Sequence, residues 1–398
     1  MEDSSVLLEK KYGANNYKPI PVVLERGEGV WVWDTQGKRY LDMMSAYSAV
    51  SQGHRHPRIV AAMIEQAKQL TLTSRAFHTS QLGPYLKELC EFTGYPKALP
   101  MNTGAEAVET AIKAARKWGH KVKGIPANTA RIITCANNFH GRTTTVISFS
   151  TEPQYQDGFG PFTPGFDTIP YGDAQALERA IKPETAAFLV EPIQGEAGIV
   201  VPPEGYLRDA ARICKQRNVL LVNDEVQTGF GRTGKMFACQ HENVKADMMI
   251  LGKALGGGLF PVSAVVGTEE VMGVFNPGDH GSTFGGNPLA CAIARAAMAV
   301  LKDEKLDERS AEMGAFLMDE LRKMQSPVVK EIRGKGLLCG IEIKKECGLA
   351  RGYVEKLMER GLLSKETHDQ VIRLAPPLVI TKEILVEACK TIKEVLQG

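Results

Sequence analysis

This sequence has almost no net charge, no long apolar run and no apolar signal core. Its 48 lysines and arginines nearly balance 46 aspartates and glutamates, leaving a net charge of +2. So small a charge gives no field that would hold nucleic acid or an anionic membrane non-specifically. Apolar runs such as Met248–Leu251 are far too short to span a bilayer. The N-terminus, MEDSSVLLEKKYG, begins acidic and lacks an apolar core, so we expect a cytoplasmic protein that is not secreted.

Closely spaced cysteine pairs are also missing. None of the eight cysteines belongs to a CxxC pair; they are Cys90, Cys135, Cys214, Cys239, Cys291, Cys339, Cys347 and Cys389. We therefore expect free thiols in a reducing cytosol, and neither a disulfide framework nor a zinc site. His54 and His56 also lack the pattern of a metal site, so no metal is predicted.

What is present is the composition of a globular protein, with 43% hydrophobic and 24% charged residues. These proportions exclude disorder, collagen and coiled-coil fibres. A length of 398 residues predicts two or three domains with a large core. Size and composition favour a soluble enzyme without saying which one.

Short runs rich in Val, Ile, Leu and Met alternate with amphipathic stretches of helical length, which predicts a mainly parallel α/β sheet. Several runs are apolar at consecutive positions, as in strands buried on both faces. The expected strands are Arg131–Cys135, Val146–Phe149, Ala187–Val190, Val219–Asn223, Met248–Leu251 and Val262–Val266. The expected helices are Pro57–Leu72, Ala105–Trp118, Pro203–Arg217 and Pro288–Leu301.

Three regions of the sequence differ in their predicted secondary structure. Residues 1–50 contain a hairpin signal with a turn at Asp34–Gly37, and this segment is too small for a core of its own. Residues 51–287 carry the strand–helix alternation of a large domain. Residues 288–398 are mostly helical with two short strands, Leu337–Ile343 and Val371–Leu374, which predicts a smaller α+β domain.

Ligands of open parallel sheets bind beyond the carboxyl ends of the strands, so the residues at these ends are candidates. Lys253 follows the strand Met248–Leu251 by one glycine. A partly buried lysine has a lowered pKa and a nucleophilic amine, which points to a Schiff base with a carbonyl compound such as pyridoxal phosphate (PLP). Ala254 follows the lysine, which excludes a phosphate-binding P-loop. A lysine in a surface turn is the plainer alternative.

Asp224 follows the strand Val219–Asn223 directly. A buried carboxylate there could keep the ring nitrogen of PLP protonated, which makes the ring an electron sink. Gln227, three residues further on, could donate to the phenolic oxygen of the cofactor. A helix N-cap or a solvated turn would also explain this aspartate.

The stretch Thr103-Gly104-Ala105 begins an expected helix, where free N–H groups and the helix dipole bind anions. Glu106 and Glu109 in its first turn could simply complement the dipole, as in an ordinary capped helix. Gly229-Phe-Gly231-Arg-Thr-Gly234 matches G-x-G-x-x-G. It does not join a strand directly to a helix, so we reject a dinucleotide site.

Six motifs in this order resemble the class III, fold-type I, PLP-dependent aminotransferases. They are NTGAEA at Asn102, NFHGRT at Asn138, EPIQGEAG at Glu191, DEVQTGFGRTG at Asp224, LGKALGGG at Leu251 and HGSTFGGNP at His280. The resemblance runs from about Tyr12 to the C-terminus. It implies a large domain with a mainly parallel seven-stranded sheet flanked by helices, a smaller α+β C-terminal domain, and PLP as cofactor.

The resemblance also implies roles for single residues. Lys253 matches the lysine that bonds to the cofactor and moves the proton, Asp224 the partner of the ring nitrogen, and Gln227 the neighbour of the phenolic oxygen. Gly104 and Ala105 match the phosphate-binding turn, and Phe139 the aromatic residue stacked on the ring. Thr283 matches a threonine that reaches the phosphate in the neighbouring subunit. This last match implies a homodimer with shared sites, or a higher oligomer built from it.

Within this family the sequence is most similar to the members that act on L-ornithine, and Tyr17 and Tyr47 carry that similarity. Acetylornithine-specific members typically have Gly-Ile-Ala where this chain has Ala46–Ser48. Ser51 departs from the asparagine expected in the ornithine branch. The resemblance implies that Arg142 holds the α-carboxylate of the substrate, assisted by Tyr17.

Arg373 then matches the arginine for the α-carboxylate of glutamate or 2-oxoglutarate, and Glu196 its switchable salt-bridge partner. The expected activity is transfer of the δ-amino group of ornithine to 2-oxoglutarate, in ornithine–proline metabolism. Two alternatives stay open. Another ω-amine, such as acetylornithine or 4-aminobutyrate, could be the substrate. More remotely, the chain could be a non-catalytic, PLP-binding regulatory module.

Overall fold

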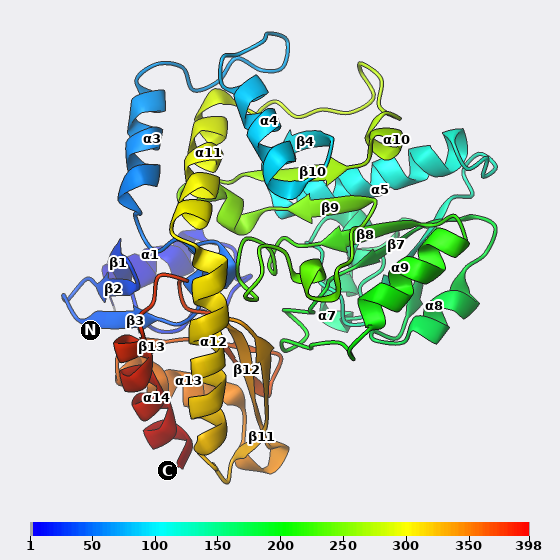
Figure 1. Ribbon diagram of the computed structural model, residues 1–398. Coiled ribbons are helices and arrows are strands. Elements are labelled where there is room, and N and C mark those ends of the chain that lie inside the picture. Colours follow the sequence, from blue (N-terminus) through cyan, green and yellow to red (C-terminus); the bar gives the residue numbers. More distant parts are fainter. Residues whose placement is uncertain (1–2, 398) are drawn as a thin grey trace.

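A central seven-stranded sheet organises the computed structural model, which describes residues 3–397. Its strand order is β4-β10-β9-β8-β7-β5-β6, and only β10 runs antiparallel to its neighbours (Figure 1). The bounds are β4 Lys97–Met101, β5 Arg131–Cys135, β6 Phe166–Ile169, β7 Thr185–Val190, β8 Leu220–Asp224, β9 Met248–Leu251 and β10 Ser263–Gly267. The expected mainly parallel sheet of fold-type I is confirmed.

Helices cover both faces of this sheet. On β9, Met248 and Ile250 pack into the core under helix α5, while Met249 and Leu251 belong to the core on the opposite face. This double burial explains why the strand is apolar at every position. The helices of this part are α3 Pro57–Ala67, α4 Leu82–Thr93, α5 Gly104–Lys121, α6 Thr144–Ile147, α7 Pro153–Gln156, α8 Ala174–Ala180, α9 Tyr206–Gln216, α10 Glu269–Met272 and α11 Pro288–Asp303.

Two smaller sheets complete the fold. The N-terminal hairpin, with its turn at residues 34–37, lies in a sheet of order β1-β2-β3-β13, and the C-terminal part holds the sheet β11-β12-β15-β14. The bounds are β1 Leu24–Glu28, β2 Trp31–Asp34, β3 Arg39–Asp42, β11 Val329–Lys335, β12 Leu338–Ile343, β13 Leu362–Leu363, β14 Lys365–Thr367 and β15 Val371–Leu374. Because β3 pairs with β13, the N-terminal segment is tied to the C-terminal part. The domain boundaries at residues 50 and 287 stay a prediction.

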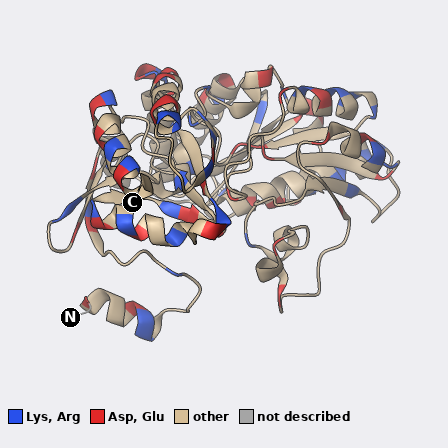
Figure 2. Ribbon diagram, turned by 90° about the horizontal axis from the view of Figure 1, so that it is seen from below, with Lys and Arg blue, Asp and Glu red and all other residues tan. Residues whose placement is uncertain are grey.

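The C-terminal part contains α12 Leu306–Lys323, α13 Ala350–Glu359 and α14 Lys382–Gln397. Helix α12 continues from α11 and runs down beside the third sheet (Figure 1). At the other end of the chain, α1 Ser4–Tyr12 has no buried residue and stands away from the body (Figure 2). Figure 2 also shows acidic and basic residues mixed along the outer helices, as the small net charge suggests.

One expected strand is wrong. Val146–Phe149 is not extended: residues 144–147 form helix α6, and the Thr143 side chain caps this helix by accepting from the backbone N–H of Val146. Val146 and Phe149 are buried in the core beneath α5. A run of apolar residues is compatible with either state, and here the cap and the packing favour a helical turn.

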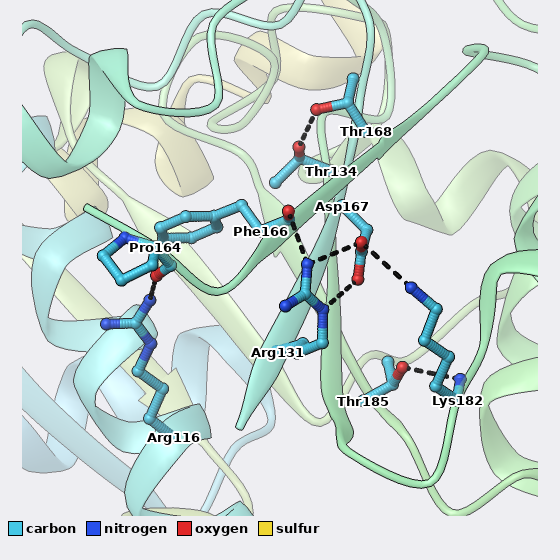
Figure 3. A network of polar contacts seen from close by, with 9 residues as sticks. All are labelled: Arg116, Arg131, Thr134, Pro164, Phe166, Asp167, Thr168, Lys182 and Thr185. Atoms are coloured by element: carbon cyan, nitrogen blue, oxygen red, sulfur yellow. Dashed lines mark hydrogen bonds and ion pairs between the residues drawn. The ribbon is translucent and has the colours of Figure 1, made fainter. Parts of the chain in front are cut away.

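A polar network ties the sheet together at the end away from the strands' carboxyl termini. Arg131, the first residue of β5, forms a bidentate ion pair with Asp167 on β6, at 2.6 and 2.8 Å (Figure 3). Lys182 approaches the same carboxylate at 3.4 Å. The Arg131 pair lowers the pKa of Asp167. This cluster stabilises the pairing of β5 with β6 and lies outside the site described below.

Within residues 3–397, no helix is long and apolar enough to cross a membrane. The same residues contain no cluster of histidine, cysteine and acidic side chains that would hold a metal ion.

Candidate active site

Five segments that follow strands of the large sheet meet around one cavity of about 220 Å³. They contribute Gly104 and Ala105 after β4, Phe139 and His140 after β5, Glu191 and Glu196 after β7, Asp224 and Gln227 at the end of β8, and Lys253 after β9. A second cavity of about 380 Å³ also includes Gly104 and Lys253 and extends to Ala46 and Val50. The residues chosen by the strand-end rule therefore lie together at one edge of the sheet.

Lys253 begins a short 3₁₀ turn directly after β9 and Gly252. Its backbone has a φ of 45°, a left-handed conformation that is strained for a residue other than glycine. Burial lowers the pKa of its amine, although the charge of Glu196 opposes this shift. Its side chain has no hydrogen bond or ion pair with the described part of the chain. The geometry thus presents an unpaired amine with an enhanced neutral fraction to the cavity.

Asp224, the last residue of β8, is held by two donors. Its Oδ2 lies 2.6 Å from Nδ1 of His140, and its Oδ1 accepts from the backbone N–H of Val226 at 3.0 Å. Burial alone would lower the pKa of His140, but the hydrogen bond and charge of Asp224 outweigh burial and raise it. The pair fixes the aspartate as a buried carboxylate facing the cavity.

Glu191 lies in the same cavity wall, directly after β7. Burial raises its pKa to about 7, against the opposing charge of His140. One of its oxygens accepts from the backbone N–H of Phe139 at 3.1 Å. This glutamate therefore fixes the backbone at the start of the Phe139–Gly141 segment.

Helix α5 begins at the cavity with a capping box. The Thr103 side chain accepts from the N–H of Glu106, and the Glu106 carboxylate accepts from the N–H of Thr103 at 2.8 Å. The N–H groups of Gly104 and Ala105 are not used by these bonds. They lie in the first turn of the helix, where backbone N–H groups have no carbonyl acceptor within the helix. A Cβ at position 104 would lie 3.2 Å from Val226, so glycine keeps this entrance open.

These residues fit PLP. An aldehyde requires an amine, and Lys253 supplies one; a phosphate requires N–H donors, which the first turn of α5 supplies. A pyridine nitrogen requires a carboxylate such as Asp224, and the apolar wall is lined by Phe139 and Val226. Two buried polar atoms of this wall, His140 Nε2 and Gln227 Oε1, have no hydrogen-bond partner among residues 3–397. Both remain available to a bound group.

Arg373 and Glu196 form a bidentate ion pair. Nη1 lies 2.9 Å from Oε1, and Nη2 lies 2.9 Å from Oε2. Burial raises the pKa of Glu196, but the charge and hydrogen bonds of Arg373 lower it to about 2. Gln227 donates to the same carboxylate at 3.0 Å. Its expected donation to the cofactor's phenolic oxygen therefore stays a prediction.

Tyr47 contacts this pair through its ring, whose centroid lies 5.0 Å from the Arg373 guanidinium carbon. It belongs to α2, Ser45–Ser48, which is one turn of left-handed conformation with φ values of 43°, 46°, 58° and 77°. For a residue other than glycine, the left-handed conformation raises the free energy of the folded state by about 1–2 kcal/mol. A strained turn of this kind persists only when its surroundings hold it.

Arg142 lies beside the cavity. Its guanidinium carbon is 3.6 Å from the ring centroid of Tyr155 and 5.5 Å from that of Phe139. Tyr17 is 80% exposed, on the N-terminal segment, yet close enough to Tyr47 to influence its pKa. Arg142 and Tyr17 thus lie at the rim of the site rather than inside it.

Thr283 does not reach the Lys253 cavity of its own chain. It lines a separate small cavity with Arg75, Phe77 and Asn287. Asn102 donates to Ser282 at 2.9 Å, which ties the Thr283 loop to the entrance of α5. This position fits the expectation that the threonine serves a neighbouring subunit.

Sequence reasoning gave no role to three residues that the structure places here, namely His140, Glu191 and Tyr155. Glu191 directly follows the expected strand 187–190, so the strand-end rule applied there would have found it. His140 follows Phe139 in a motif already identified by resemblance. Tyr155 has no local signal, because only tertiary packing brings it to Arg142.

Comparisons with known proteins agree with this geometry. The Aminotransferase class-III family model matches residues 12–396. An ornithine aminotransferase from Brevibacillus brevis is 60% identical over 398 residues, which is 100% of this chain and 99% of that protein. A structure of the Toxoplasma gondii ornithine aminotransferase, with PLP at partial occupancy in its active site, has a TM-score of 0.98 and 48% identity, covering 100% of this chain and 94% of that one. An acetylornithine aminotransferase from Elizabethkingia anophelis has a TM-score of 0.90 and 51% identity, covering 98% of each chain.

Proposed function

Because the chain belongs to the class-III aminotransferases, a PLP-dependent family, we propose that it transfers the δ-amino group of L-ornithine to a 2-oxo acid. The products are glutamate 5-semialdehyde, which cyclises to pyrroline-5-carboxylate, and the amino acid formed from the acceptor. Among the structural observations, the bidentate Glu196–Arg373 pair beside Lys253 carries the proposal.

PLP, when bound, supplies an aldehyde that carries the amino group and a protonated ring that withdraws electrons. The chain supplies the rest. Lys253 holds the cofactor and then acts as the base that moves a proton at the δ-carbon of the substrate, a task for which its lowered pKa suits it. Asp224, fixed by His140, holds the proton on the ring nitrogen.

Ornithine has two amines and one carboxylate, so the site must choose which amine reacts. Arg142, with Tyr17, binds the α-carboxylate at the rim and presents the distant δ-amine to Lys253. A free Arg373 would bind the carboxylate in the opposite orientation and present the α-amine. Because Glu196 is already paired with Arg373, the substrate carboxylate cannot bind there, and the opposite orientation is blocked. The site thus gains specificity by excluding the wrong orientation.

The acceptor in this scheme is 2-oxoglutarate. It has two carboxylates and no amine, so it can draw Arg373 away from Glu196 while its second carboxylate binds Arg142. Gln227, which already donates to Glu196, can hold that glutamate when the arginine leaves it. One site then serves two substrates of different charge by rearranging a single ion pair.

The proposal includes a homodimer whose sites are shared. Thr283 lines a cavity other than the Lys253 cavity of its own chain, and Phe77 in the same lining and the adjacent Phe284 are 69% and 51% exposed. Large exposed aromatic side chains on one surface are typical of an interface. The eight cysteines are all unpaired, which fits a reducing compartment such as the cytoplasm.

Acetylornithine is the second candidate substrate, because the Elizabethkingia anophelis enzyme named for it is 51% identical to this chain. Residues 46–48, Ala-Tyr-Ser, favour ornithine over acetylornithine, since the tyrosine hydroxyl can bond to the polar end of an unmodified amino acid.

A single half-reaction tests the proposal. The purified PLP-loaded protein is mixed with ornithine and no acceptor, and the absorbance of the cofactor's aldehyde form is followed while o-aminobenzaldehyde traps pyrroline-5-carboxylate. We expect rapid loss of the aldehyde band and one equivalent of trapped product per site. Reaction with acetylornithine and none with ornithine would replace the proposed substrate.

A further inference from the structure

Arg232 lies inside the G-x-G-x-x-G match at Gly229–Gly234, for which the sequence predicts no dinucleotide site. Its side chain is completely buried and has no ion pair with any described carboxylate. Instead, Nη1 donates to the carbonyls of Leu337 and Pro376 at 3.0 and 2.6 Å, and Nη2 donates to the hydroxyls of Ser45 and Ser51, both at 3.0 Å. One guanidinium thus joins three distant parts of the chain.

The glycines of the motif allow this loop to lie against other backbone. A Cβ at Gly234 would approach Ala311 to 3.0 Å, and one at Gly231 would approach Asp307 to 3.1 Å; both glycines have φ near 90°. From the other side, a Cβ at Gly336 would come within 2.3 Å of Thr233. The motif therefore serves to bury Arg232 between the C-terminal part and the N-terminal segment.

The two serines that accept from the Arg232 guanidinium lie at the start of the left-handed turn and shortly after its end. Ser45 is its first residue, and its hydroxyl donates a hydrogen bond to the carbonyl of Ala375 at 2.6 Å. Ser51 donates to the carbonyl of Ser48, the last residue of the turn, at 3.0 Å. Both serines are completely buried. The guanidinium therefore holds the turn at both ends, and Tyr47 projects from its middle onto Arg373.

We propose that Arg232 is a positioning residue that acts through Ser45 and Ser51 to hold the left-handed turn, and so places Tyr47 in the substrate site. The turn also lines the cavity next to Lys253 through Ala46. Loosening it therefore changes how the amino acid end of the substrate is held. The effect on substrate binding rests on the proposed function, whereas the hold on the turn does not.

The experiment compares Ser51→Ala with a matched control, Ser310→Ala. Both serines are completely buried and both contact Arg232. Ser310, however, donates to the backbone carbonyl of Arg232 at 2.9 Å and does not contact the turn. Arg232→Lys is a further variant, since lysine keeps the charge and loses the planar fork. Hydrogen exchange of peptides covering residues 44–53 is measured by mass spectrometry on each PLP-loaded protein, followed by KM and kcat for ornithine.

In Ser51→Ala we expect faster exchange in residues 44–53 and a KM for ornithine raised about five- to tenfold, with kcat within about twofold. The Ser310→Ala protein is expected to match the wild type in both readouts. Equal changes in the two variants, or unchanged exchange in Ser51→Ala, would overturn the inference. Arg232→Lys is expected to show the same faster exchange in residues 44–53, and wild-type exchange there would remove Arg232 from the hold on the turn. If wild-type protein does not react with ornithine, the proposed function fails, while the exchange of Arg232→Lys and Ser51→Ala still decides whether Arg232 holds the turn.

Discussion

Lys253 and Glu196 line the same cavity, and burial acts against the charged form of each. For Lys253 burial outweighs the opposing charge of Glu196, and the pKa of the amine falls. For Glu196 the bidentate contact with Arg373 overrides burial and lowers the pKa to about 2. The lowered pKa of Lys253 favours its neutral, reactive amine. The lowered pKa of Glu196 keeps its carboxylate ionised and paired with Arg373, which controls the orientation in which the substrate binds.

Glu196→Gln tests that control. The variant keeps the shape of the side chain but cannot neutralise Arg373, so the ornithine carboxylate gains a second binding place. We expect the fraction of converted cofactor that yields trapped pyrroline-5-carboxylate to fall several-fold, because the α-amine now reacts as well. Glu204→Gln, at an exposed glutamate that does not line the Lys253 cavity, is the control and is expected to leave that fraction unchanged. An undiminished fraction in Glu196→Gln would remove Glu196 from the selection of the amine.

The same carboxylate predicts a pH effect on stability. The folded-state pKa of Glu196, about 2, lies below its ordinary value of 4.5, so the stabilisation is present above pH 4.5 and is lost as the pH falls toward 2. Denaturant unfolding of wild type and Glu196→Gln between pH 6 and 2.5 measures it. We expect the difference in their free energies of unfolding to be constant above pH 5 and to shrink below it. A difference that grows on acidification would contradict the assigned direction.

At the scale of the elements, the left-handed turn Ser45–Ser48 stores strain in four residues that are not glycine. Ala46 is exposed, with φ 46° and ψ 50°, so its side chain contributes little packing. Ala46→Gly is expected to raise the melting temperature by about a degree or more, because relief of about 1–2 kcal/mol of strain exceeds the entropy cost of glycine, about 0.5–1 kcal/mol. Calorimetry checks this, and a lowered melting temperature would mean that the turn is not strained.

The strands show what pattern alone can predict. Strands β5, β9 and β15 have the predicted bounds. Strand β9 is apolar and buried at every position, as expected of a strand covered on both faces, whereas β5 and β15 each contain polar residues. Strand β4, KALPM, and strand β6, FDTI, were missed since each is short and contains polar or proline residues. The left-handed turn was missed as well, because nothing in Ser-Ala-Tyr-Ser favours positive φ. Tertiary hydrogen bonds impose that conformation.

The site was predictable to the extent that it follows strand ends. Asp224 and Lys253 were found from their places after strands, and the Gly104 turn from its place at the start of a helix; the cavity joins all three. Phe139, Arg142, Glu196, Tyr47 and Arg373 were located only by resemblance, because no local pattern distinguishes them from ordinary surface or core residues. Arg232 was read only as part of a rejected motif, since its role depends on serines about 180 residues away in the chain.

At the scale of the whole molecule, the proposal requires two chains to complete each site. Lys253→Ala removes the essential amine, and Thr283→Ala is expected to weaken PLP retention in the neighbouring site. Mixing the two variants under conditions that exchange subunits creates hybrids in which one site has both native residues. We expect activity at limiting PLP to rise well above that of either variant alone. No gain in verified hybrids would place Thr283 outside the partner's site.

The proposed chemistry depends on Lys253 as the residue that bonds to PLP, and the site of that bond can be measured directly. The PLP-loaded protein is reduced with borohydride, digested and sequenced by mass spectrometry. We predict that the pyridoxyl group is found on the peptide containing Leu251-Gly252-Lys253, on that lysine alone. A pyridoxyl group on another lysine, or no adduct on a protein that holds PLP, would contradict the assignment.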